Sequence, residues 1–275
     1  MTNAVSHYWV NHLDPIILNL GPLAIRWYGL MYILGFAAGY MLLVRRQRAR
    51  LLDLPDAQAV QDMLFYAFCG VLVGGRLGHC LFYDPAAYLA KPWEILMVWT
   101  GGMSSHGGFI GVMVMIAWFA RRRKVAFLNL LDNVVYAATP GLFFGRIGNF
   151  INGELPGKVT QVPWAVVFPS TDMLPRHPVQ IYQALTEGVL LFFLLSFVGR
   201  KKRPNGLISA LFALAYASVR IATETLRESS SELAGPLGIT QGQFLSLFVV
   251  VLGVVLLVIS TRQNRVRNEF GEKTK

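Results

Sequence analysis

The chain has 275 residues, of which 54% are hydrophobic and only 15% charged, and its mean hydropathy is +0.47. Soluble domains carry roughly 25% charged residues, so this composition excludes an ordinary soluble domain and predicts an integral membrane protein. The formal net charge of +10 would suggest a nucleic-acid ligand in a soluble protein, but the placement of the basic residues favours another explanation.

Seven apolar segments approach the length of about 20 residues that a helix needs to cross a bilayer. In chain order they are 24–44, 62–83, 106–120, 127–147, 179–198, 206–226 and 241–260. The third is short, and the fourth contains Asp132 and Pro140, so the bounds of these two are the least sharply defined. The pattern predicts one polytopic membrane domain over residues 1–275, an all-α bundle of about seven transmembrane helices.

The basic residues are clustered along the chain. Of the 25 Lys and Arg residues, 17 lie at 45–50, 121–124, 200–203 and 262–275. These clusters follow the first, third, fifth and seventh segments, as expected for cytoplasmic loops, which are enriched in Lys and Arg. An odd number of crossings then places the N-terminus in the periplasm and the C-terminus in the cytoplasm. The membrane accounts for the charge, and no nucleic-acid partner is predicted.

The longest polar insertion, residues 148–178, falls on the predicted outer face and contains several prolines and turn-forming residues. It is long enough for a small periplasmic cap and too short for an independent domain. No cleavable signal peptide is predicted, because no basic region precedes the first apolar segment.

Nothing in the sequence predicts a metal or an organic cofactor. The five histidines show no metal-ligand spacing, and neither an HExxH motif nor a GxSxG nucleophile elbow is present. The two cysteines, Cys69 and Cys80, are separated by eleven residues of one predicted helix, roughly 16 Å along its axis. That distance is too long for a disulfide, so both are predicted to be packing residues.

One helix carries a polar stripe. In YASVRIATETLR, residues 216–227, the polar side chains of Tyr216, Arg220, Glu224 and Arg227 lie within 80° of one another on a helix with 100° per residue. A charge at the centre of a spanning helix costs about 2.5–3.5 kcal/mol on insertion scales, so each needs a partner. The stripe is either a structural ion pair around Glu224 or the wall of a cavity whose arginines bind an anion.

A second polar group closes the fourth segment, in GRIGNFINGE (145–154). Arg146 and Asn149, three residues apart, share a helix face that would otherwise be apolar. A helix cap and its loop would by themselves account for Asn152 and Glu154. Upstream, His106 stands at the start of the third segment, where it is either an interfacial residue or a general base, since a free imidazole titrates near pH 6.5.

Six motifs follow one another over nearly the whole chain: RWYGLMY (26–32), GGRLG (74–78), WTGGMSSHGG (99–108), GRIGNFINGELPG (145–157), PRHPVQIYQ (175–183) and YASVRIATETLR (216–227). In this order they resemble the motifs of the prolipoprotein diacylglyceryl transferases of bacterial inner membranes. The fourth corresponds to the family signature and is the most specific. The chain departs from the family pattern at Gln183, where an acidic residue is expected, and after Arg227.

The resemblance implies the reaction. The family moves a diacylglyceryl group from phosphatidylglycerol to the thiol of a lipobox cysteine, just after the signal peptide of a preprolipoprotein, and glycerol phosphate leaves. By motif, Arg146 and Arg220 would bind the phosphate and His106 would be the base. Further positions on which the family depends are Tyr28, Asn149, Glu154, Gly157, Tyr216, Glu224 and Arg227. Membrane lipids are the surroundings, and no cofactor is required.

Two other classes of function use the same arginines. An anion transporter would line a path with them, and a non-catalytic scaffold would bind anionic lipid without turnover. The outward bias of the polar residues in the predicted topology favours a site open to one side over a path through the membrane. The sequence leaves open whether Arg26 and Arg76 contact substrate or only fix helices.

Overall fold

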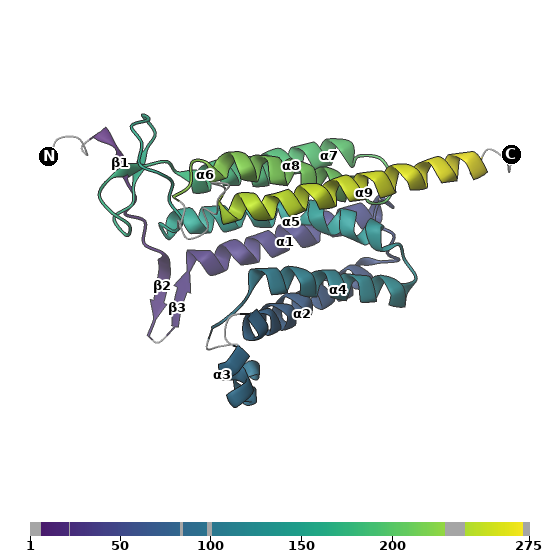
Figure 1. Cartoon of the computed structure of the whole chain (residues 1–275), viewed down its shortest axis with the longest axis horizontal. Helices are drawn as coiled ribbons and strands as arrows, with labels where there is room; N and C mark the ends of the chain where they lie inside the picture. The colour runs from purple at the N-terminus through teal and green to yellow at the C-terminus, as the bar shows by residue number, and fades with distance from the viewer. Residues whose placement is uncertain (1–6, 22, 83–84, 98–100, 229–239, 272–275) are drawn as a thin grey trace. The chain divides into compact units, whose positions relative to one another are not determined.

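The computed structural model describes residues 7–21, 23–82, 85–97, 101–228 and 240–271 (Figure 1). By its internal contacts the chain divides into two compact units. The first comprises Met1–Leu42 and Val134–Lys275, and the second is Leu43–Asn133. The prediction of a single membrane domain over the whole chain stays a prediction.

The described part of the chain is predominantly helical, as an integral membrane protein of the all-α class requires. Five of its helical stretches are long and apolar enough to span a membrane: Trp27–Arg48, Ala57–Phe82, Val179–Val198, Leu207–Glu224 and Gly242–Arg265. Helices α4 (Ser105–Arg123) and α5 (Phe127–Ile151) match the third and fourth predicted segments in position. They do not meet the same measure of apolarity, so the count of seven crossings stays a prediction.

The first unit begins with a β-hairpin that leads into α1 (Trp27–Arg48). Strand β2 (Ile16–Leu20) pairs antiparallel with β3 (Leu23–Arg26), and Gly21 takes a φ of 64° at the turn. The prediction of a spanning segment from residue 24 was therefore wrong at its start. Residues 24–26 are apolar enough for a helix, but their backbone groups pair with β2 instead.

Close packing in the first unit depends on glycines. A Cβ on Gly35 of α1 would lie 3.0 Å from Cα of Gly141 in α5. A Cβ on Gly188 would lie 2.5 Å from the Phe143 side chain. Helix α8 (Leu207–Glu224) lies along α9 (Gln241–Gly271), as Figure 1 shows. The small residues let helix backbones approach closely, as is common in membrane bundles.

Residues 179–198 form one span with an irregular turn at its centre. It consists of α6 (Val179–Gln183), the π-helical turn η4 (Ala184–Leu190) and α7 (Leu191–Val198). Single π-turns inside α-helices are rare and often mark functional sites. This turn contains Glu187, whose side chain is fully buried.

The polar insertion 148–178 contributes to a small sheet. Strand β1 (Trp9–Val10) pairs parallel with β4 (Val166–Val167), which pairs antiparallel with β5 (Pro175–Arg176). Phe168, next to β4, is completely buried and packs edge-on against Phe150 of α5. The insertion is therefore folded, while its periplasmic location stays a prediction.

The second unit is built on a tight pair of helices, α2 (Ala57–Phe82) and α4. Cβ atoms at Gly70 and Gly74 would fall 2.6 and 2.3 Å from the carbonyl oxygens of Gly111 and Gly107. Only glycine permits this approach. Two short helices, α3 (Pro85–Ala90) and η2 (Pro92–Leu96), follow α2. Of the cysteines, Cys80 is buried and Cys69 half-buried, and both are free, as predicted.

Candidate anion-binding site

The centre of the candidate site is Glu187, which holds two arginines from different helices. Arg146 of α5 donates from Nε and Nη2 to Glu187 Oε2 at 3.1 and 2.9 Å. Arg220 of α8 places Nη1 3.7 Å from the other oxygen, Oε1. Both arginine side chains are mostly buried, with 17% and 13% exposure. Arg146 and Arg220, which lie 41 and 33 positions from Glu187 in the sequence, thus share its carboxylate.

The last turn of α8 extends the same ion-pair network. Glu224 Oε2 lies 3.1 Å from Arg220 Nη2 and 3.7 Å from Arg227 Nη1. The polar stripe predicted over 216–227 is therefore present, with Glu224 between two arginines. Arg227 lies beyond the end of the helix, however, and its backbone pairs with Gly157 in an isolated β-bridge.

The charges of this cluster do not cancel. Three guanidinium groups, of Arg146, Arg220 and Arg227, face two carboxylates, of Glu187 and Glu224, which leaves one net positive charge. Among the described residues, three atoms of the cluster are buried without a hydrogen-bond partner: Glu187 Oε1, Arg220 Nη1 and Glu224 Oε2. A buried donor without an acceptor costs about 1–3 kcal/mol, and more when it is charged, so Arg220 Nη1 is suited to donate to an anionic oxygen.

The signature segment turns sharply just after α5. Glu154 N donates to Asn149 O at 2.9 Å, and Gly153 takes a φ of 67°. In that turn Asn149 and Asn152 both donate to the Glu154 carboxylate, at 2.9 and 3.0 Å. Glu154 itself is exposed. The sequence analysis offered a helix cap and its loop as an explanation for Asn152 and Glu154, and these contacts show that both residues are part of such a turn.

Gly157 lies where three segments meet. Its N–H donates to His177 O at 2.9 Å, and a Cβ at this position would approach the same oxygen to 2.6 Å. Lys158 N donates to Leu226 O at 2.8 Å, which ties this segment to the chain after α8. Any side chain at Gly157 would push the segments around His177 and Arg227 away from it.

A buried arginine also holds the backbone at Gly157 in place. Arg176 of β5 pairs with Asp172 and with Glu228, and its Nη1 donates to Gly157 O at 3.0 Å. The hydrogen bonds from Arg176 hold the pKa of the Asp172 carboxyl below its usual value. The arrangement fixes the backbone on both sides of Gly157.

The two predicted tyrosines have different surroundings. The ring of Tyr28 packs on Gly148, where a Cβ would come within 2.8 Å of it, and its hydroxyl lies 3.3 Å from that of Tyr32. Tyr216 of α8 stacks on Phe212 with 5.6 Å between ring centroids. Gly148 therefore lets Tyr28 lie against the helix that carries Arg146 and Asn149.

The remaining predicted residues lie outside the cluster. His106 is exposed in the first turn of α4, in the second unit, where Ser104 caps the helix by accepting from Gly107 N at 3.2 Å. Arg26 is exposed at the end of β3.

Arg76 is buried in α2 and donates to four backbone carbonyls, those of Glu94, Ile95, Gly101 and Gly102. Its guanidinium is occupied by two carbonyls of η2 and by those of Gly101 and Gly102. This arrangement indicates a structural role.

Two functional candidates were missed by the sequence interpretation. The signal for Glu187 was present in the sequence, because an acid within the apolar stretch LTEGVLLFF is as costly to bury as an arginine. Gln183, noted only as a departure from a family pattern, is buried and donates to Thr223 Oγ1 at 3.5 Å. Among the described residues, no three His, Cys, Asp or Glu side chains gather as a metal site would need.

The apolar helices and the buried, positively charged arginine–carboxylate cluster define a class: a polytopic, mostly helical membrane protein with a cluster of charged side chains between its helices. Comparison with known proteins gives the family. The family model described as prolipoprotein diacylglyceryl transferase matches residues 15–259. The chain belongs to the prolipoprotein diacylglyceryl transferase family.

Similar proteins cover almost the full length. The chain is 44% identical over 266 residues to the phosphatidylglycerol–prolipoprotein diacylglyceryl transferase of Pseudoalteromonas atlantica, covering 94% of each chain. It is 46% identical to the protein of that name from a Janthinobacterium species, over 93% of this chain and 98% of the relative. For the Aeromonas salmonicida relative the identity is 43% over 98% of each.

Proposed function

We propose that the protein transfers the diacylglyceryl group of phosphatidylglycerol to the thiol of the lipobox cysteine of preprolipoproteins. This is the first step of lipoprotein modification, and the names of the relatives support it. The structural observation that carries the proposal is the buried Arg146–Glu187–Arg220 cluster with its single excess positive charge. A phosphodiester headgroup carries one negative charge and matches that excess.

In the proposed reaction, the arginine cluster stabilises the negative charge of the leaving phosphate. The cysteine sulfur attacks the glyceryl carbon, the bond from that carbon to the phosphate oxygen breaks, and the thiol proton passes to a base. The phosphodiester, with one negative charge, leaves as glycerol phosphate, whose charge increases as the bond breaks. Fixed guanidinium groups in a site with little water stabilise such developing charge, typically by several kcal/mol.

Glu187 acts in this proposal as a positioning residue. By binding Nε and Nη2 of Arg146, it fixes the plane of that guanidinium before substrate arrives. Arg220 Nη1, buried without a hydrogen-bond partner, is the donor assigned to a phosphate oxygen. Arginine suits this role because its planar fork matches phosphate geometry. Seven further residues are assigned to substrate binding around Arg146 and Arg220: Tyr28, Asn149, Glu154, Gly157, Tyr216, Glu224 and Arg227.

His106 is proposed as the base that accepts the thiol proton. A free cysteine thiol has a pKa near 8.5 and needs a base or a positive field to attack as thiolate. Substitution His106→Gln should reduce turnover at neutral pH by about 100-fold or more, the usual contribution of general-base catalysis. Substantial activity in this variant would assign proton removal to water or another group.

The membrane arrangement is also a proposal. We assign α4 and α5 as crossings in addition to the five apolar spans, which gives seven. Helix α4 supports this because its basic residues, Arg121, Arg122 and Arg123, all fall in its last turn. The N-terminus is then periplasmic and the C-terminus cytoplasmic in a bacterial inner membrane, and residues 148–178 form the periplasmic cap. Both substrates are amphiphiles, so we propose that they enter sideways between helices.

The decisive experiment is mass spectrometry of a lipobox peptide incubated with purified protein and phosphatidylglycerol. Wild type should add one diacylglyceryl group to the cysteine, whereas Arg146→Ala and Arg220→Ala should each abolish turnover. The control is Arg200→Ala, because Arg200 is exposed and stacks only on Phe197 among the described residues. Folded wild-type protein that leaves the peptide unmodified would contradict the proposal, and anion flux into liposomes would then favour a transporter.

A further inference from the structure

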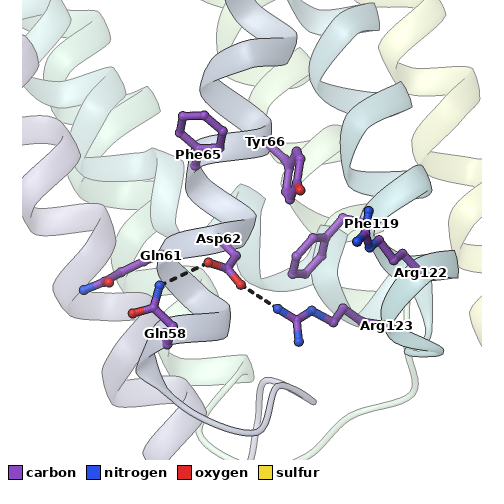
Figure 2. Close-up of a pocket in the computed structure, with 8 residues that line it drawn as sticks. All are labelled: Gln58, Gln61, Asp62, Phe65, Tyr66, Phe119, Arg122 and Arg123. Carbon is purple, nitrogen blue, oxygen red and sulfur yellow. Dashed lines mark hydrogen bonds and ion pairs between the residues drawn. The ribbon is translucent and has the colours of Figure 1, made fainter.

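An open groove of about 620 Å³ lies at one end of the α2–α4 pair, and none of the residues assigned to the reaction lines it (Figure 2). It is lined by the first turns of α2, including Gln58 and Asp62, and by the last turn of α4, including Arg122 and Arg123. The end of α4 belongs to the basic cluster 121–124, which the proposed topology places on the cytoplasmic side.

The change from small to large side chains along the two helices explains why the groove exists. At Gly70, Gly74, Gly107 and Gly111 the backbones touch. Four residues before Gly70 in α2, and eight residues after Gly111 in α4, the contact positions carry bulky groups, about 6 and 12 Å along the two helix axes. There the rings of Tyr66 and Phe119 meet at 5.7 Å between centroids and form the inner wall.

The polar side of the groove is an incompletely neutralised basic site. Asp62 accepts from Gln58 at 3.2 Å and pairs with Arg123 at 2.5 Å, as Figure 2 shows. Arg122 instead lies over the Trp118 ring, 5.3 Å from its centroid, and forms no ion pair with any described residue. Two guanidinium groups and one carboxylate leave one net positive charge at the groove.

The apolar side continues along the helix surface. Phe65 borders the groove with 62% of its surface exposed, and Phe68 and Leu72 follow on the same face at 47% and 37% exposure. The groove therefore offers a cationic end next to an exposed apolar strip on a helix that can span the membrane. Basic pockets between transmembrane helices on the cytoplasmic side are typical binding sites for acidic lipid headgroups.

We propose that this groove binds an anionic phospholipid of the cytoplasmic leaflet, with the phosphate at Arg122 and Arg123 and an acyl chain along Phe65, Phe68 and Leu72. The mixed lining selects this occupant: a soluble phosphate compound would leave the apolar strip uncovered, and a zwitterionic lipid would bring no net charge. This lipid is a bound component and is not consumed in the reaction.

The test counts lipids bound to the purified full chain in detergent by native mass spectrometry, with dioleoyl phosphatidic acid as the probe. Arg122→Gln with Arg123→Gln should lower the affinity for one bound lipid roughly 30-fold, and Arg122→Gln alone about fivefold, from the usual contribution of a basic residue to lipid binding. The single variant keeps the Arg123–Asp62 pair and therefore the fold.

The matched control is Arg45→Gln with Arg48→Gln, which removes the same charge from two exposed arginines of α1. This pair should leave lipid binding unchanged, and dioleoyl phosphatidylcholine should not occupy the groove. An equal loss in both pairs would overturn the proposal in favour of diffuse attraction, and no loss in either would overturn it by showing that Arg122 and Arg123 do not hold the phosphate. Displacement of the lipid by millimolar glycerol phosphate would overturn it in favour of a soluble ligand.

Discussion

The substitution Glu187→Gln tests whether one buried carboxylate organises the anion site. It removes one negative charge and keeps the shape of the side chain. Glu187 is completely buried and lies within 4 Å of both Arg146 and Arg220. The net charge of the cluster would rise from one to two, at a position whose side chain is buried from bulk solvent.

The expected loss of stability follows from this burial. Removing one partner of a buried ion pair typically costs about 3–5 kcal/mol, because the other charge stays buried without compensation. An exposed pair contributes only about 0–1 kcal/mol. The matched control is therefore Glu94→Gln, which breaks an exposed pair with Lys91 at 3.4 Å. We expect a loss of several kcal/mol for Glu187→Gln and less than about 1 kcal/mol for the control.

The measurements are unfolding by SDS in mixed micelles, followed by tryptophan fluorescence, and the rate of peptide modification. If Glu187 positions Arg146, Glu187→Gln should lower kcat more than it raises KM, and Glu187→Asp should restore part of kcat. A Glu187→Gln variant as stable as the Glu94→Gln control would show that the buried Glu187 carboxylate stabilises the fold no more than an exposed one.

Two further predictions concern packing and pH. Gly74→Ala should destabilise the protein by about 1–3 kcal/mol, as overpacking does, because the new Cβ would lie 2.3 Å from Gly107 O. Gly141→Ala, with open space around its Cβ, should be neutral or stabilising, and equal unfolding midpoints would contradict the packing argument. The Asp172 pKa is lowered in the folded protein, chiefly by hydrogen bonds from Arg176, so its stabilisation should be complete above about pH 5 and lost as the pH falls through that lowered value. Asp172→Asn should flatten this part of a stability-against-pH curve, and an unchanged slope would assign the acid sensitivity to other groups.

Much of the helical framework follows from the sequence because hydrophobic length and charge position are local properties. The seven predicted segments correspond to the seven longest helical stretches, and basic clusters end α1 and α4. The start of α1 was misplaced because residues 23–26 bond to β2, a contact between strands that apolar length does not reveal.

The candidate site was predictable where it depends on one helix and unpredictable where it depends on three. The pairs of Glu224 with Arg220 and Arg227 follow from spacings of four and three residues. Glu187 meets Arg146 and Arg220 only because α5, η4 and α8 pack together, and helical periodicity within one segment contains no information about that. Whether His106 serves as the base stays a prediction.

The π-turn at Ala184–Leu190 makes the site sensitive to the number of residues in its helix as well as to their identity. A π-turn accommodates one extra residue within an otherwise α-helical span. Deleting one exposed residue there, such as Leu185, would let the turn relax to regular α-helix. Because the turn absorbs the extra residue, α6 and α7 would keep nearly the same faces, and the side chains that change direction would be those within the turn, Glu187 among them. A single-residue deletion in this membrane helix would therefore act on Glu187 and leave the packing of both halves in place, although no charged residue is lost.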